Sequence, residues 1–175
     1  KFNAIELPRL IDRMVRESNV IDLKKLVVVD GEKVWIVIID IYPLNDDGAL
    51  IDAASIATIA ALMQTHIPSL DENGRIDHEG KSTKKLPLAE GTIPLTFSFY
   101  KLGDSLIIDP TREEEEACDS KIIWGISNWK GKEHMIHSCQ KGKETPLNRE
   151  DIEFMMKELP KLYDDTLKKL KKFLK

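Results

Sequence analysis

The sequence predicts an α+β fold in which paired strands alternate with helices around one core. Two observations favour this class. β-branched runs arrive in pairs joined by short turns, and segments with helical periodicity precede, separate and follow them. The 175 residues, of which 42% are hydrophobic, suffice for one sizeable core and not for two. We therefore expect a single domain or part of one, with helices packed on a mixed or antiparallel sheet.

The first 64 residues predict two helices that flank a hairpin. An apolar stripe at helical spacing lies near the start, where Pro8 favours the first helical turn; its members are Leu7, Leu10, Ile11, Met14 and Val15. Asp30-Gly31 then joins the two runs of "LVVVDGEKVWIVIIDIY", and the second run alternates little, which indicates a central strand covered on both faces. Ala49 to Gln64 is apolar nearly all round and predicts a buried helix that starts near Asp47-Gly48.

The remainder predicts two strand pairs, a short helix and a long one. Leu70 to Glu90 is polar and Gly-punctuated, so we expect a flexible loop with at most a short hairpin. The strand pairs turn around Leu102 to Asp104 and Lys130 to Lys132. In "DPTREEEEACD", Thr111 can cap a helix whose Glu114 completes a capping box. Pro146 to Lys175 reads as one amphipathic helix.

Composition excludes several classes of function. The 26 Lys and Arg residues against 30 Asp and Glu give a net charge of −4, so any RNA contact needs a local patch. Cys118 and Cys139 have neither zinc-ligand nor disulfide-framework spacing. No apolar run approaches the ~20 residues of a membrane-spanning helix. We expect no metal, no cofactor, no membrane association and a cytoplasmic location.

The stretch "NDDGALIDAA", residues 45–54, has the shape of a phosphate-binding turn, because a glycine after polar residues leads into a helix. It contains no Arg, Lys, Ser or Thr, the side chains that hold an anion at such a turn. Asp46 and Asp47 would also repel a phosphate, by roughly 4 kcal/mol for one charge about 4 Å away at an effective dielectric constant near 20.

Three segments together resemble a known family. "AIELPRLIDRMVRESNVIDLKKL", "VWIVIIDIYPLNDDGALIDAASIATIAALM" and "LIIDPTREEEEACDSKI" are similar to the second half of an RNase PH-type domain. More narrowly, they resemble the non-catalytic RNase PH-like ring subunit of the archaeal exosome. The resemblance starts near Ala4 and fades over residues 70–90 and after Asn128.

The resemblance implies an RNase PH-like fold, also described as ribosomal protein S5 domain 2-like. Residues 1–175 would form the C-terminal portion of a single RNase PH-like domain, with residues 70–90 as a flexible loop or short hairpin within it. The N-terminal half would be missing, an expectation that also follows from Lys1 standing almost inside a helical pattern. A lone second half would expose core surface, and it would aggregate or find its other half.

The resemblance also implies two degenerate sites. Catalytic relatives hold phosphate in a Gly-Gly-Thr-Arg turn, and the matching positions here are Gly48, Ala49, Leu50 and Ile51. Relatives further place two acids near the scissile phosphate and a divalent metal. Here Asp109 matches the first acid and Glu115 stands at the second, where its longer arm alters the metal geometry. The structural alternative is that this acidic run only caps a helix.

Three arginines form the candidate RNA contact. Arg9, Arg13 and Arg16 lie at i, i+4 and i+7 and project from one side of the first helix. The alternative to an RNA contact is that these arginines form a solvated helix face, on which Asp12 pairs with Arg16. In the resembled subunit, arginines on this helix grip the RNA backbone, which suits the planar guanidinium.

The resemblance therefore implies a non-catalytic, structural and RNA-binding subunit. It would pair with a catalytic RNase PH-like subunit in a heterohexameric ring, with RNA-binding cap proteins, for 3′-to-5′ phosphorolysis of single-stranded RNA. The alternative is an active phosphate-dependent 3′-to-5′ exoribonuclease that uses Asp109 and Glu115. An unrelated α+β domain with accidental motif likeness is the third possibility. The missing Thr-Arg pair after Gly48 favours the non-catalytic subunit.

Overall fold

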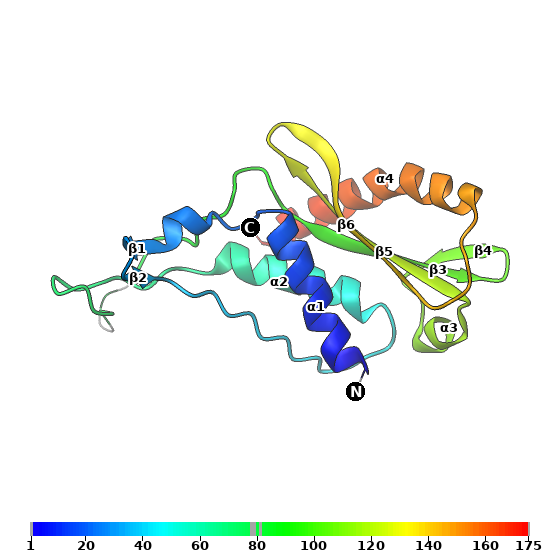
Figure 1. Ribbon diagram of the computed structural model, residues 1–175, viewed down its shortest axis with the longest axis horizontal. Coiled ribbons are helices and arrows are strands. Elements are labelled where there is room, and N and C mark those ends of the chain that lie inside the picture. Colours follow the sequence, from blue (N-terminus) through cyan, green and yellow to red (C-terminus); the bar gives the residue numbers. More distant parts are fainter. Residues whose placement is uncertain (1, 78–79, 81, 175) are drawn as a thin grey trace.

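The structure, a computed structural model, describes residues 2–77, 80 and 82–174. Its helices and strands follow one another in the order expected for an α+β chain (Figure 1). They are α1 (Phe2–Glu17), the 3-10 turn η1 (Leu23–Leu26), β1 (Val27–Val29), β2 (Lys33–Val34), α2 (Leu50–Gln64), β3 (Leu95–Leu102), β4 (Ser105–Ile108), α3 (Arg112–Ala117), β5 (Ser120–Trp129), β6 (Lys132–Gly142) and α4 (Arg149–Phe173). The predicted α+β class is confirmed.

The main sheet has four strands in the order β4-β3-β5-β6, and all neighbouring pairs are antiparallel. Phe99, near the middle of β3, lies opposite Ile108 on one side and Ile122 on the other. The two hairpins predicted for residues of this sheet are confirmed, and each turn contains a glycine with positive φ, Gly103 and Gly131. Such a turn needs the conformational freedom of glycine at low steric cost.

Helices cover both faces of this sheet, which explains why residues 95–100 of β3 are all buried. Thr96 and Ser98 face α2 and bond to its side chains. On the opposite face, the Lys101 Nζ lies 2.5 Å from the Asp151 Oδ2 of α4. Successive side chains of a strand point to opposite faces, so the two helices are held by alternate residues of one strand.

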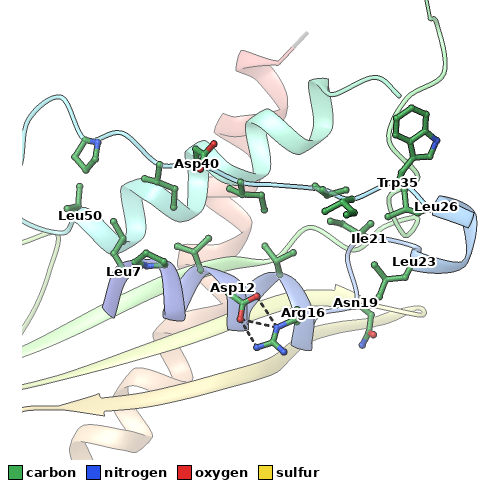
Figure 2. Close-up of a pocket in the computed structure, with 18 residues that line it drawn as sticks. Leu7, Asp12, Arg16, Asn19, Ile21, Leu23, Leu26, Trp35, Asp40 and Leu50 are labelled. Carbon is green, nitrogen blue, oxygen red and sulfur yellow. Dashed lines mark hydrogen bonds and ion pairs between the residues drawn. The ribbon is translucent and has the colours of Figure 1, made fainter. Parts of the chain in front are cut away.

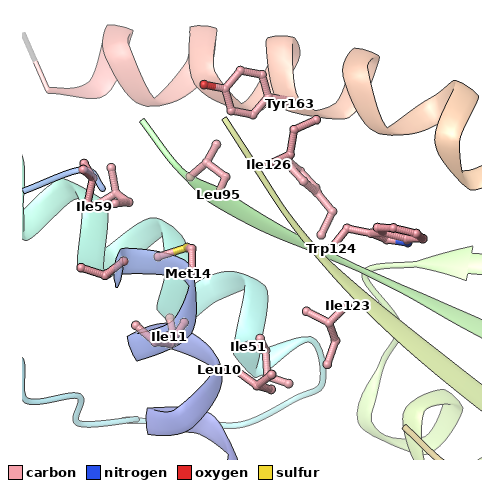
Figure 3. Packing of buried hydrophobic residues seen from close by; sticks show 14 of the residues in the cluster. Leu10, Ile11, Met14, Ile51, Ile59, Leu95, Ile123, Trp124, Ile126 and Tyr163 are labelled. Atoms are coloured by element: carbon pink, nitrogen blue, oxygen red, sulfur yellow. The ribbon is translucent and has the colours of Figure 1, made fainter. Parts of the chain in front are cut away.

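A single hydrophobic core runs through the sheet (Figure 3). Tyr163 of α4 packs above the sheet, where Leu95 and Ile126 are directed toward it. Ile123 and Ile51 lie on the other side, among side chains of α1 and α2. The core therefore joins the first helices to the sheet and does not divide into two.

Local signals set several helix ends. Thr111 accepts a hydrogen bond from the Glu114 N–H and the Glu114 side chain accepts from the Thr111 N–H, so the predicted capping box is confirmed. The predicted C-terminal helix is confirmed and begins at Arg149 behind a second capping box. The expectation for Pro8 was wrong, because α1 begins at Phe2 and places this proline in its second turn.

The predicted central strand after Asp30-Gly31 is the main error. Only Lys33–Val34 pairs, with Val27–Val29, and residues 35–43 belong to no strand. Their side chains still alternate, with Trp35 half-buried and Ile36 79% exposed. Within the described residues, only the Trp35 N–H of this segment donates to another backbone group, the Leu26 C=O. The segment has strand character, but the described chain supplies no neighbouring strand.

An apolar groove of about 1060 Å³ lies between α1 and residues 35–43 (Figure 2). Its walls include Leu7, Ile11, Val15, Trp35, Val37 and Ile41. Residues 70–76 form a one-rung hairpin through the bridge between Leu70 and Ile76. In the part of the chain that the structure describes, no helix is both long and apolar enough to span a bilayer.

The groove and its unpaired extended segment predict self-association of the isolated chain, because exposed apolar strands pair with other chains. Replacing Ile36 and Ile38, which are 79% and 77% exposed, by threonine should lower the association. The free energy of unfolding should change by no more than about 0.5 kcal/mol per site, since both lie at the surface. Sedimentation velocity over a concentration series measures the effect.

The control is Phe154→Thr, which removes an apolar side chain that is 49% exposed on α4, away from the groove. It should leave the sedimentation coefficient of the wild type unchanged. A wild-type chain that stays monomeric at all concentrations would contradict this account of the groove.

A closed anion turn and an arginine face

The turn before α2 is fixed by its close approach to the start of α3. Gly48 has φ +96°, a conformation that favours glycine. A Cβ at this position would lie 2.2 Å from the Pro110 carbonyl oxygen and 2.7 Å from the Thr111 carbonyl carbon. Both the backbone conformation and the space therefore require glycine.

The side chains that follow Gly48 belong to the core. Ala49 is 5% exposed and Ile51 8% exposed, and Leu50 packs against the same core cluster. Ala49 is the N-cap residue of α2 in a left-handed conformation, and it makes no side-chain cap. The positions expected to carry a hydroxyl and a guanidinium thus carry packing groups instead.

Glu115 supplies the anion that the turn lacks. Its Oε2 accepts a hydrogen bond of 3.1 Å from the Ala49 N–H, although the two residues are 66 positions apart. Its Oε1 lies 3.5 Å from the Nζ of Lys121, and both side chains are largely buried. The two sites that the sequence treats separately, the turn and the acid at 115, therefore form one contact. Lys121 was missed because its role depends on strand β5 passing beside α3.

Asp109, the other predicted acid, stands apart from this contact. It is exposed at the end of β4 with φ 55°. Its charge nevertheless helps to raise the pKa of Asp52, so the two carboxylates share one neighbourhood. Across residues 2–77, 80 and 82–174, His, Cys, Asp and Glu side chains form no group of three or more that could hold a metal ion.

Asp52 is an acid that sequence reasoning missed. It is the one charged residue in the apolar run of α2, which could have drawn attention to it. Its Oδ2 accepts from the Ser98 N–H at 2.8 Å, and its Oδ1 accepts from the hydroxyls of Ser98 and Thr96 at 2.8 and 3.1 Å. Burial raises its pKa to about 6, and these hydrogen bonds only partly oppose that effect.

Tyr100 lies beside the same acids. Its hydroxyl is buried and has no hydrogen-bond partner among the described residues. Burial raises the pKa of the hydroxyl, and the charges of Glu115 and Asp52 raise it further. The region between α2, β3 and α3 therefore contains two carboxylates, those of Asp52 and Glu115, and a tyrosine hydroxyl that donates no hydrogen bond to the described residues.

The two aspartates before Gly48 face a cation. Arg112 bonds to Glu116, which is the main reason for its raised pKa, and Asp46 and Asp47 raise it further. Asp46 also accepts a weak bond of 3.4 Å from the Gly48 N–H. Their repulsion of an incoming phosphate is thus reduced by a neighbouring guanidinium.

The predicted arginines lie on α1, and two of them pair within the helix. The Arg9 Nη2 lies 2.6 Å from the Glu6 Oε1, and the Arg16 Nη2 lies 2.5 Å from the Asp12 Oδ2, the pair expected from the sequence. The Arg16 pair stands at the rim of the groove (Figure 2). Both side chains of the Arg16 pair are exposed, and such a pair contributes little stability and can exchange for another anion. The Glu6 side chain of the Arg9 pair is only 17% exposed.

Arg13 is placed differently from its two neighbours. It is half-buried, and its Nη1 donates to the Gln140 Oε1 of β6 at 3.1 Å. Gln140 in turn donates to Glu6 at 2.5 Å, so Glu6 links α1 to β6. No sequence spacing signals this contact, because 127 residues separate its ends.

The fold described above, an antiparallel sheet covered by helices on both faces, is that of an RNase PH-type α+β protein. Residues 2–68 match the model of domain 1 of the 3′ exoribonuclease family, and residues 92–158 match the model of its domain 2. The chain belongs to this family.

Within the family, the chain is similar to archaeal proteins named exosome complex component Rrp42. It is 38% identical to the one from Methanothermobacter thermautotrophicus over 150 residues, which are 85% of this chain and 53% of that relative. It is 44% identical to the one from Methanosarcina acetivorans over 119 residues, 68% of this chain and 42% of that relative. The chain thus spans about half the length of the curated relatives it matches.

Solved structures agree with this relationship. A chain of the Archaeoglobus fulgidus exosome with RNA bound to the active site superposes with a TM-score of 0.78 at 33% identity, covering 94% of this chain and 61% of that one. A chain described as archaeal exosome core gives 0.75 at 35% identity, covering 89% and 58%. The predicted RNase PH-like fold is confirmed.

Asp52 gives the structure a pH dependence. Its pKa is raised from 3.8 to about 6, so between these values the folded state keeps a proton that the unfolded state has released. The free energy of unfolding should therefore fall as pH rises from about 4 to about 6, by roughly 2 to 3 kcal/mol, and level off above. Asp52→Asn should lack this loss.

Denaturant unfolding of both proteins at several pH values measures the difference. Asp104→Asn, in the exposed β3–β4 turn, is the matched control and should follow the wild-type curve. Parallel curves for wild type and Asp52→Asn would show that the Asp52 proton does not contribute.

Proposed function

We propose that this chain is a non-catalytic, structural and RNA-binding subunit of an archaeal-type exosome. It pairs with a catalytic RNase PH-like subunit in a heterohexameric ring that receives RNA-binding cap proteins. The partner carries out 3′-to-5′ phosphorolysis of single-stranded RNA, and this chain contributes no catalytic residue. The complex acts in the cytoplasm.

The start of α2 carries the proposal. Phosphorolysis needs orthophosphate held beside the scissile bond, and in this chain the two positions for donor side chains are Leu50, which packs against the core, and Ile51, which is buried in it. Giving either position an anion-binding side chain would require burying a polar group in that core. The turn therefore serves packing, and the chemistry falls to another subunit.

The comparisons support the exosome as the setting. The similar proteins bear the name exosome complex component, and the similar structures are described as archaeal exosomes, one with RNA at its active site. These descriptions belong to proteins that are longer than this chain, so assembly and RNA contact are proposed for it by similarity.

The arginine face supports the RNA-binding part. Arg9 and Arg16 are accessible, and Arg16 is held by an exposed carboxylate, Asp12, that a phosphate can replace. Arg13 is oriented by Gln140 and completes the row. Guanidinium groups on one helix face contact successive phosphates without reading bases, which suits a subunit that holds RNA of any sequence.

The proposal predicts no turnover by the chain alone. Purified full chain with magnesium, inorganic phosphate and end-labelled poly(A) should release no nucleoside diphosphate, because no phosphate is bound beside the RNA. Co-expression with a catalytic RNase PH-like subunit should give a complex that elutes as one species and degrades the RNA.

Diphosphate release by the isolated chain would favour the alternative, an exoribonuclease that uses Asp109 and Glu115. Absence of co-elution would remove the proposed assembly.

In the assembled complex, Arg9→Glu with Arg13→Glu should weaken RNA binding and slow decay while leaving assembly intact. The plot of log affinity against log salt should become shallower by about 1 or more, since each lost phosphate contact on a single strand contributes about 0.7. Fluorescence anisotropy at several salt concentrations measures both quantities.

Arg149→Glu is the matched control. This arginine is 89% exposed on α4 and pairs with Glu153 within its helix, so Arg149→Glu matches in charge one of the two reversals of the double variant. Equal RNA affinity for the double variant and this control would reject the arginine assignment.

A further inference from the structure

The beginning of α2 is a helix end whose donors need an acceptor. The first N–H groups of a helix have no partner within it, and a side chain of the N-cap residue usually accepts from them. Ala49 has no such group, and the Ala49 N–H itself points to Glu115. Among the described residues, the N–H groups of Leu50 and Ile51 donate to no other group.

The carboxylate of Glu115 occupies the position that a bound anion would take. It accepts from the Ala49 N–H through Oε2 and faces the Lys121 ammonium through Oε1. A backbone N–H at a helix start and a lysine are the donors that hold phosphate in proteins. Here they converge on a side chain of the same molecule.

The surroundings point to an oxyanion-sized position. The Tyr100 hydroxyl, which is fully buried and unpartnered, lies close enough to be affected by the Glu115 charge. The cavity left beside Glu115 and Lys121, which Glu6 and Asp46 also line, measures only about 30 Å³. Since a water molecule needs about 10 to 15 Å³ by this kind of measure, the carboxylate fills the space and leaves room for little more than water.

Neighbouring side chains hold the backbone of Glu115 in this place. Its own carbonyl accepts hydrogen bonds from the Lys143 Nζ at 3.2 Å and from the Cys118 Sγ at 3.0 Å. The capping box at Thr111 fixes the start of α3. The carboxylate therefore stands on a short helix that is anchored at both ends.

We propose that Glu115 is a built-in phosphate mimic that occupies and closes the anion position of the α2 turn. The inference rests on the proposed function, because closing this position matters for a subunit that leaves phosphate binding to its partner. The inference goes further than the proposed function, because it states that the turn can still bind an oxyanion. The Glu115 carboxylate prevents that binding by its charge and by its volume.

Two substitutions separate charge from volume. Glu115→Gln removes the charge and keeps the shape, and Glu115→Ala removes both. With inorganic phosphate as the probe, Glu115→Ala should bind at least about ten-fold more tightly than the wild type, with Glu115→Gln between them. Thermal midpoints of the full chain over a phosphate series, and the NMR shift of the Ala49 amide, report this binding.

Glu113→Gln is the matched control, because Glu113 is an exposed acid on the same helix. It should behave as the wild type does. A folded Glu115→Ala without a phosphate-dependent midpoint or Ala49 shift would overturn the proposal, and so would saturable phosphate binding at Ala49 in the wild type. If Glu115→Ala fails to fold, a lack of phosphate response in folded Glu115→Gln would equally overturn it.

The test of Glu115 and the test of the proposed function can fail independently of each other. RNA turnover by the wild-type chain would refute the non-catalytic role, whatever Glu115 does. A wild type without turnover whose Glu115 variants still ignore phosphate would refute only the mimic.

Discussion

The structure depends on the docking of the first turns of α2 against β3 and the start of α3. Gly48 approaches the Pro110 backbone too closely for any side chain, and the Ala49 N–H is bonded to Glu115. One turn later, the Asp52 carboxylate accepts from Ser98 on β3. Each contact joins a residue within the domain 1 match to one within the domain 2 match. These contacts join the two segments that match the family's domains into one hydrophobic core.

The same constraint determines what the turn can do. A helix start that packs against a neighbouring helix still needs an acceptor for its donors, because buried unpaired N–H groups are costly. In this chain the acceptor is Glu115, and the positions for a hydroxyl and a guanidinium are filled by Leu50 and Ile51 of the core. The turn before α2 therefore carries packing side chains where a phosphate turn would carry donors, and in the proposed function the RNA contact falls to the arginines of α1.

Local patterns were predictable from the sequence and long-range ones were not. The capping box at Thr111 and the hairpin at Gly103 depend on neighbours a few residues away, and both were found as expected. The predicted central strand after Asp30-Gly31 was wrong beyond Val34 because pairing needs a second strand, which periodicity within one segment cannot supply. The contact between Ala49 and Glu115 spans 66 residues, so the sequence could indicate an incomplete turn but not the group that completes it.

The central claim is that the chain's own carboxylate takes the place of phosphate. A crystal structure of the full chain soaked in inorganic phosphate tests it most directly. We predict that Glu115 stays within hydrogen-bond distance of the Ala49 N–H and that no oxyanion density lies beside Ala49 or Leu50. Density for an oxyanion on those amides, with the Glu115 side chain turned away, would contradict the account.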